Sequence, residues 1–212
     1  MKFKDRIKQF GFFTTIKTSF YYLIRHVVRI ESYIILIIED HEKSSIDDLV
    51  SIMTSEKIEN WKKNKFISKK DFVRFMKFLN SGCIGYYIEI ENELAAWGFV
   101  ETKGVYQYGK YLYKIPYRMH ILKNLFVRPK FRGMSLGKHI NKARINSIPD
   151  GYIPCGFVVP ENRFAIRNLK MFGFEEYLTI SNITLFKTFE KAKIKTLKND
   201  EMTKLIISGF KK

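Results

Sequence analysis

A short stretch near the middle of the chain has the residue types of a phosphate-binding turn. An apolar run over residues 121–127 predicts a strand, and Pro129 predicts its end because proline cannot donate a ladder hydrogen bond. A helix predicted over residues 136–148 would point its free N–H groups at an anion. The turn between them carries small and basic residues: Arg132, Gly133, Met134, Ser135, Leu136, Gly137 and Lys138. The pattern favours a phosphate or pyrophosphate site, and an ordinary glycine-rich connection is the alternative.

Two well-known nucleotide loops are not matched here. The spacing of Gly133 and Gly137 is G-x-x-x-G, which differs from the dinucleotide pattern G-x-G-x-x-G. No acidic residue follows at the distance expected for a ribose contact, and the Walker A pattern is also absent from the sequence.

The same residues resemble motif A of the GNAT superfamily of N-acetyltransferases, which reads Gln/Arg-x-x-Gly-x-Gly/Ala. Residues 132–137 follow it with Ser135 in place of the middle glycine, and Val127, Pro129 and Phe131 match the usual lead-in. Further on, an asparagine (Asn162), a predicted helix and a Gly-Phe pair eleven residues later resemble the family's second block. The resemblance covers residues 30–187 and is sharpest in the second half.

The expected fold is α/β (α+β): a GNAT-like mixed, mostly antiparallel sheet flanked by helices. Three parts are predicted: a basic amphipathic N-terminal helix (1–29), a GNAT-like acetyltransferase domain (30–187) and a basic C-terminal tail (188–212) with helical character. Within the domain, periodicity predicts strands over 30–38, 83–90, 94–100, 115–127, 152–159 and 177–186, helices over 46–61, 70–79, 136–148 and 161–172, and a loop over 101–113.

Charge is concentrated at the two ends of the chain. The formal net charge is +17, and residues 1–29 carry seven basic side chains against one acidic one. Their apolar residues recur every three or four positions, which predicts an amphipathic helix. Three readings stay open: a helix packed on the core, an interfacial helix on an anionic membrane, or a partner or homodimer helix. A lysine-rich composition alone is a further explanation of the charge. We expect neither a cleavable signal peptide nor a membrane-spanning segment.

The resemblance implies acetyl-coenzyme A as the cosubstrate. Backbone groups of Leu125, Phe126 and Val127 would pair with the pantetheine arm and position the thioester carbonyl. N–H groups from Arg132 to Lys138 would hold the pyrophosphate, and Asn162 would lie near the pantetheine.

Catalytic side chains are less evident. Many family members carry a tyrosine acid seven residues after the motif asparagine, where this chain has Leu169, which cannot donate a proton. Many also carry a glutamate base where this chain has Ile121 and Leu122. His120 titrates near neutral pH and is the candidate base, with a structural histidine as the alternative.

Other polar and reactive residues have two readings each. Tyr108, Tyr111 and Tyr117 are candidates for stacking on a sugar acceptor, and tyrosine is also a common strand residue. Cys83 and Cys155 fit no metal-ligand spacing, so no metal site is expected. Cys155 could carry an acyl group, but a buried inert thiol is the favoured reading.

The leading functional hypothesis is an N-acetyltransferase that moves an acetyl group from coenzyme A to a primary amine. An amino sugar in surface polysaccharide synthesis is the candidate acceptor. The expected location is cytoplasmic, with a peripheral position on the inner face of the cell membrane as an extension. The alternative is a non-catalytic GNAT-like acyl-coenzyme A-binding or protein-interaction domain. Nucleic-acid binding is supported by charge alone and by no motif.

Overall fold

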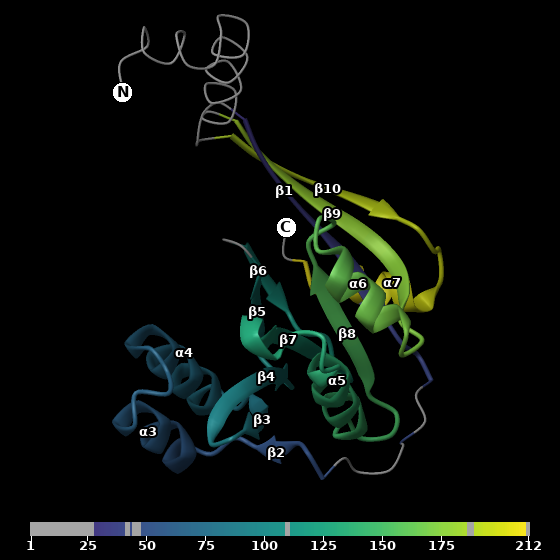
Figure 1. Ribbon diagram of the computed structural model, residues 1–212. Coiled ribbons are helices and arrows are strands. Elements are labelled where there is room, and N and C mark those ends of the chain that lie inside the picture. Colours follow the sequence, from purple (N-terminus) through teal and green to yellow (C-terminus); the bar gives the residue numbers. More distant parts are fainter. Residues whose placement is uncertain (1–27, 41–42, 44–47, 109–110, 186–188, 211–212) are drawn as a thin grey trace, which may run out of the picture.

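The computed structural model describes residues 28–40, 43, 48–108, 111–185 and 189–210 (Figure 1). The predicted N-terminal helix therefore lies outside the described residues, apart from Val28 and Arg29, which begin the first strand. Among the described residues, no helix is long and apolar enough to cross a bilayer.

The described chain alternates strands and helices in the following order: β1 (Val28–Ile37), β2 (Ser51–Ile52), α3 (Ser55–Lys63), α4 (Lys69–Asn80), β3 (Ile84–Ile90), β4 (Glu93–Glu101), β5 (Val105–Tyr108), β6 (Tyr111–Lys114), β7 (Met119–Val127), α5 (Leu136–Asn146), β8 (Ile153–Val158), α6 (Arg163–Lys170), β9 (Glu175–Leu185), β10 (Phe189–Thr196) and α7 (Glu201–Ser208). A short 3-10 turn, Pro129–Phe131, joins β7 to the start of α5.

Eight strands form one sheet in the order β10-β9-β1-β8-β7-β4-β3-β2, and β5 and β6 form a separate hairpin. Every neighbouring pair in the large sheet is antiparallel except β7 and β8, which are parallel. The prediction of a mixed, mostly antiparallel sheet is confirmed.

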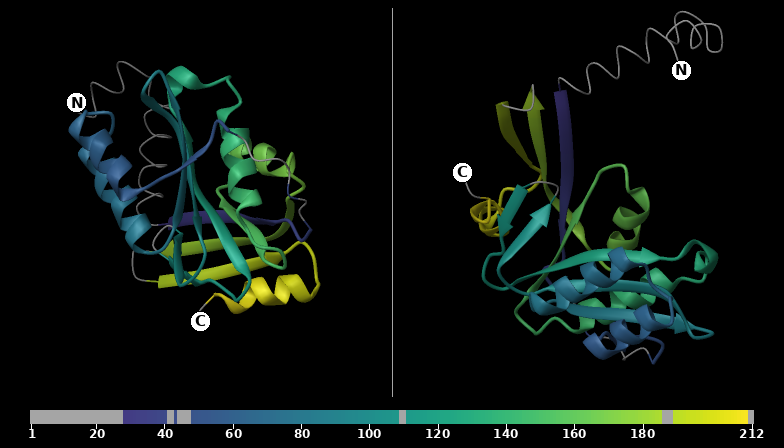
Figure 2. Two further views of the ribbon diagram at one scale, coloured as in Figure 1. Left: turned by 90° about the horizontal axis from the view of Figure 1, so that it is seen from below. Right: turned by 90° about the vertical axis from the view of Figure 1, so that its left-hand side faces the viewer.

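Both faces of the sheet are covered, which explains the nearly continuous apolar sequence of β4. Helices α5 and α6 pack on one face through Leu136, Ile140 and Leu169. On the opposite face, α3 and α4 cover β3 and β4 (Figure 2). The β5–β6 hairpin and α7 cover the rest of that face, and the Tyr113 hydroxyl donates to the carbonyl of Ile206 at 3.0 Å. We call these the α5 face and the α4 face.

Three sequence predictions of local structure are wrong. The helix predicted to begin at residue 46 begins at Ser55, because Thr54 caps it by accepting from the backbone N–H of Lys57 at 3.2 Å. The predicted loop over 101–113 contains the β5–β6 hairpin. The strand predicted from residue 115 begins at Met119, because a turn at Pro116 and Arg118, with φ +70° at Arg118, precedes it.

The C-terminal tail also differs from the prediction. Residues 189–196 form β10 and pair with β9 at the edge of the sheet, while a helix is present only over Glu201–Ser208. Lysines alternate with other residues from Lys191 to Lys195, which is the period of a strand. Edge strands commonly carry lysine because its charge discourages pairing with a second molecule.

Candidate functional site

The central strands β7 and β8 separate halfway along their length. Their parallel pairing runs from Met119 opposite Ile153 to Leu122 opposite Gly156. Beyond that point β7 continues to Val127 and pairs only with β4 among the described strands. The backbone of Leu125, Phe126 and Val127 therefore faces β8 without a strand partner. We call this opening the split.

The turn that follows β7 lies at the open end of the split and leads into α5. Gly133 has φ +90°, and a Cβ added there would meet nothing within 4 Å. Ser135 has φ +58° and makes no side-chain hydrogen bond as the N-cap of α5. First-turn N–H groups of a helix without a side-chain cap are available to an anion.

The side chains of the predicted cofactor residues fall into two groups. Arg132, Met134 and Lys138 are exposed around the turn, whereas Leu136 is buried in the core and offers only its backbone. Gly137 faces α6 rather than the turn, since a Cβ there would lie 3.3 Å from Nδ2 of Asn168. A bulky residue at Gly137 would disturb helix packing, so this position cannot test anion binding cleanly.

The second-block residues lie on α6, above β8. The Asn162 side chain caps this helix by accepting from the N–H of Ala165 at 3.1 Å. Leu169 is 5% exposed, and a Cβ on Gly156 would lie 2.7 Å from its Cδ1. Leu169 thus fills the space over Gly156, the last residue of β8 that pairs with β7, and no hydroxyl group stands at that position.

His120 lies on the paired part of β7, before the split begins. It is buried, and its ring centroid is 4.9 Å from that of Tyr152. Burial lowers the pKa of the imidazole. This setting favours a neutral structural histidine, and a catalytic role for His120 stays a prediction.

A buried ion pair that sequence reasoning missed lies on the α4 face at the start of the split. Lys123 Nζ is 2.8 Å from Glu101 Oε2, and both side chains are buried. The Lys123 ammonium also lies 4.1 Å from the ring centroid of Phe78 on α4. Charged residues inside the apolar runs of β4 and β7 were the available signal, but Glu101 was taken as the start of a loop.

Tyrosines of the β5–β6 hairpin stand beside this ion pair. Tyr106 packs on Phe157 of β8 at 4.9 Å between ring centroids. Burial raises the pKa of Tyr106, and neighbouring Cys155 and Glu101 raise it further. Tyr108 is buried against the same Phe157 at 5.6 Å, so it forms part of the wall rather than a free stacking platform.

The remaining candidates lie elsewhere. Tyr117 is 77% exposed, outside the hairpin. Cys83 and Cys155 are buried free thiols, as predicted. Burial raises the pKa of the Cys155 thiol, which disfavours the thiolate that an acyl-cysteine mechanism would need.

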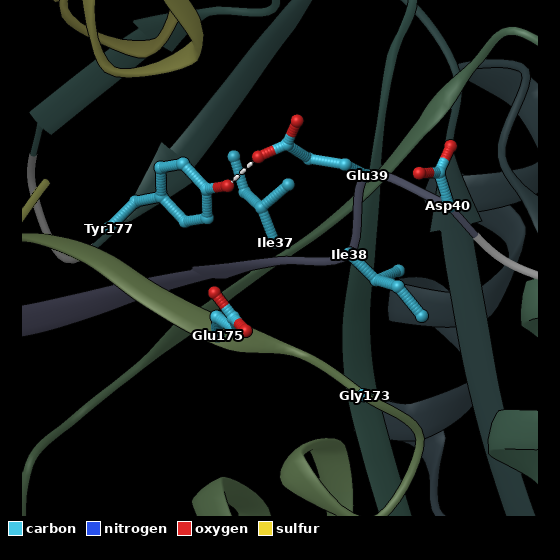
Figure 3. A pocket seen from close by; sticks show the side chains of 7 residues that line it. All are labelled: Ile37, Ile38, Glu39, Asp40, Gly173, Glu175 and Tyr177. Carbon is cyan, nitrogen blue, oxygen red and sulfur yellow. Dashed lines mark hydrogen bonds between the residues drawn. The ribbon is translucent and has the colours of Figure 1, made fainter. Parts of the chain in front are cut away.

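A separate acidic pocket lies at the other end of β8, where the backbone N–H of Ile38 meets the carbonyl of Pro154. Figure 3 shows Glu39, Asp40, Glu175 and Tyr177 around it, with the Tyr177 hydroxyl bonded to Glu39. Lys198 pairs with Glu175 beside the pocket. Within the part of the chain that the structure describes, no group of three or more acidic, histidine or cysteine side chains could hold a metal ion. The pocket is also distinct from the split, because the two lie at opposite ends of β8.

No family model and no curated protein matches the chain. Among solved structures, it is similar to a GNAT-family protein from Novosphingobium aromaticivorans DSM 12444, with 17% identity and a TM-score of 0.54 over 75% of this chain and 65% of that one. The chain thus spans slightly less than two thirds of that protein.

Two further structures resemble the chain more distantly. One is a GNAT-family acetyltransferase from Colwellia psychrerythraea (12% identity, TM-score 0.49, 78% of this chain and 59% of that one). The other is an aminoglycoside N-acetyltransferase in complex with CoA (17% identity, TM-score 0.45, 60% and 91%). The neighbours are GNAT-family acetyltransferases, and the likeness to the Novosphingobium structure, at 17% identity, shows the fold alone.

Proposed function

We propose that the protein is an acetyltransferase that moves an acetyl group from coenzyme A to an amine. The observation that carries this proposal is the split, which opens directly toward the uncapped N-terminus of α5. The backbone of residues 125–127, which has no strand partner on the β8 side, suits an extended amide-bearing arm. The turn at Gly133 and Ser135 suits a pyrophosphate. Arg132 and Lys138 add positive charge at the same end.

The thioester supplies an activated acyl group, and the chain must orient it and remove a proton from the attacking amine. The amine nitrogen bonds to the thioester carbonyl carbon as the carbon–sulfur bond breaks. Glu101 is the proposed proton acceptor, because its carboxylate is buried on the α4 face beside the start of the split. Lys123 holds this carboxylate in place through the 2.8 Å contact. With Leu169 in the usual position of the acid, water is the proposed proton donor to the leaving thiolate.

Cofactor binding is tested by reversing the charge of the turn. The double variant Arg132→Glu/Lys138→Glu should weaken acetyl-coenzyme A binding by tenfold or more in calorimetry, since two charge-assisted contacts to phosphate are replaced by repulsion. Lys70→Glu, an exposed reversal on α4, is the matched control and should leave affinity unchanged. Equal affinity in the double variant and the control would remove the turn from the site.

A non-catalytic acyl-coenzyme A-binding domain is the second candidate, and Leu169 is the observation that favours it. Release of free thiol in the presence of a panel of amines separates the two. Binding of acetyl-coenzyme A without thiol release for any amine would support the non-catalytic reading.

The finer assignment remains an amino sugar acceptor and a cytoplasmic enzyme held at an anionic membrane by residues 1–29. The seven basic side chains of that segment support it. Co-sedimentation with anionic and neutral liposomes tests the membrane part. Binding that needs anionic lipid and is lost without residues 1–29 is the expected result. Equal liposome binding by a chain without residues 1–29 would contradict this assignment. So would a segment that is needed only to form a homodimer and adds nothing to liposome binding.

A further inference from the structure

A buried arginine of α5 reaches the sheet at the point where the split begins. Arg144 is 2% exposed, and its Nη1 donates to the carbonyls of Phe99 at 3.3 Å and Lys123 at 3.1 Å. Its Nη2 donates to Oδ1 of Asn141, and its Nε is buried without a hydrogen-bond partner. No carboxylate pairs with Arg144 among the described residues. Burial lowers the pKa of this guanidinium to about 9. A buried charge without an opposite charge is costly, so its retention calls for a reason.

The two carbonyls belong to the irregular part of the sheet. The β4–β7 register shifts between the pairs Trp97–Phe126 and Phe99–Lys123, and Asn124 has φ +52°. Gly98 makes room for the guanidinium, since a Cβ there would lie 3.1 Å from Arg144 Cζ. Arg144 therefore holds the bulge after which β7 no longer pairs with β8.

The same network reaches the other side of the split. Asn141 is fully buried and donates through Nδ2 to Oδ1 of Asn168 on α6 at 2.7 Å. Helix α6 packs on β8 through Leu169 over Gly156. Figure 1 shows α5 and α6 beside one another in front of the two strands. We call Arg144, Asn141 and Asn168 the clasp, because they connect the bulge of β7 to the helix that covers β8.

We infer that the clasp sets the width of the split and so positions the pantetheine arm of the bound coenzyme A. This inference rests on the proposed function. The clasp residues are positioning residues, since they act through the backbone of β7 and through α6. Arg144 follows Leu136 by eight residues, which is about 12 Å along a helix. Arg144 is therefore remote from the anion-binding turn, whereas Asn168 at the far end of the clasp lies beside Gly137. Loss of Arg144 should affect the two halves of the cofactor differently.

The experiment compares two ligands by calorimetry on the full-length protein: acetyl-coenzyme A and 3′-phospho-ADP, which lacks the pantetheine arm. Arg144→Met removes the donors while keeping an unbranched side chain, and Asn168→Leu breaks the far end of the clasp. Arg167→Met, an exposed arginine on α6, is the matched control. Thermal unfolding establishes that each variant is folded at the temperature of the titration.

Arg144→Met should lose about tenfold or more in affinity for acetyl-coenzyme A and less than about twofold for 3′-phospho-ADP, because a shift of the channel by about 1 Å is enough to misplace a bound group. Asn168→Leu should weaken acetyl-coenzyme A binding too, and it can also weaken 3′-phospho-ADP binding, because Asn168 lies beside Gly137. Arg144→Lys should recover part of the loss. If Arg144→Met does not fold, Arg144→Lys decides the question, since it should show the same difference between the two ligands to a smaller extent.

An unchanged ratio of the two affinities in the folded Arg144 variants would overturn the clasp as a positioning device. That result differs from failure of the proposed function, in which the wild-type chain itself binds neither ligand.

Discussion

Two buried cations meet at one bulge from opposite faces of the sheet, and they are held in different ways. Lys123 points to the α4 face and pairs with the carboxylate of Glu101 at 2.8 Å. Arg144 approaches from the α5 face and binds backbone carbonyls, including that of Lys123 itself at 3.1 Å. In the proposed function, Lys123 holds the proton acceptor Glu101, whereas in the further inference Arg144 shapes the strand. Substitutions on the α4 face should therefore change turnover, whereas substitutions of Arg144 should change the position of the bound cofactor.

The largest expected effect is on catalysis, through Glu101. Glu101→Gln removes the proposed proton acceptor but keeps the side-chain volume, so kcat/KM should fall by about 10²- to 10⁴-fold. Affinity for acetyl-coenzyme A should stay the same, because Glu101 lies on the α4 face and not in the pyrophosphate turn. Steady-state thiol release and calorimetry measure the two quantities. Glu59→Gln on the exposed surface of α3 is the control.

Retained turnover in Glu101→Gln would assign the ion pair to structure alone. A parallel loss of cofactor affinity would instead mean that the two faces are not independent, and the comparison would fail.

The next effect is on stability, and it compares the two cations directly. Lys123→Met leaves a buried carboxylate without its partner, which costs about 3–5 kcal/mol. Arg144→Met leaves three neutral oxygens without a donor, each costing about 1–3 kcal/mol. Removal of a buried charge that has no opposite charge offsets most of this cost. We expect Lys123→Met to lower the free energy of unfolding more than Arg144→Met does. Denaturant unfolding of both variants measures this order, and the reverse order would show that Arg144 is the principal structural cation.

The motif residues were predictable because their signals are local. Two glycines and a proline at a strand end can be recognised within twelve residues. Gly133, with φ +90°, forms the turn where the sequence predicts it. The helices and strands with clear periodicity, such as α4 and β3, also appear at nearly the predicted residues.

The clasp and the ion pair were not predictable, because each depends on contacts between distant segments. Arg144 follows Leu136 and Ile140 at helical spacing on the buried face of α5. The sequence does not show what a buried guanidinium there would bind, and only the packing against Gly98 and the bulge shows it. Glu101 and Lys123 are 22 residues apart and meet only through the β4–β7 register. In β10 the high lysine content led to the prediction of a basic tail. The alternation of lysine with other residues, which indicates a strand, was given less weight.

The smallest expected effect concerns His120, which is, with Lys123, the second buried titratable group on β7. Burial lowers its pKa in the folded state, so the unfolded chain binds a proton at a higher pH than the folded chain does. Stability from this group is therefore complete above about pH 6.5, the ordinary pKa of histidine, and declines as the pH falls toward the folded-state pKa. His120→Gln should lessen the loss of unfolding free energy between pH 7.5 and pH 5.

The activity of His120→Gln decides between the two readings of this residue. A structural histidine predicts a change in kcat/KM of less than about twofold at every pH, against the 10²- to 10⁴-fold expected for a general base. A loss of that size, together with loss of the rise in kcat/KM with increasing pH, would transfer the proton-accepting role from Glu101 to His120. It would also move the chemistry away from the α4 face, because His120 packs against Tyr152 on the side of α5.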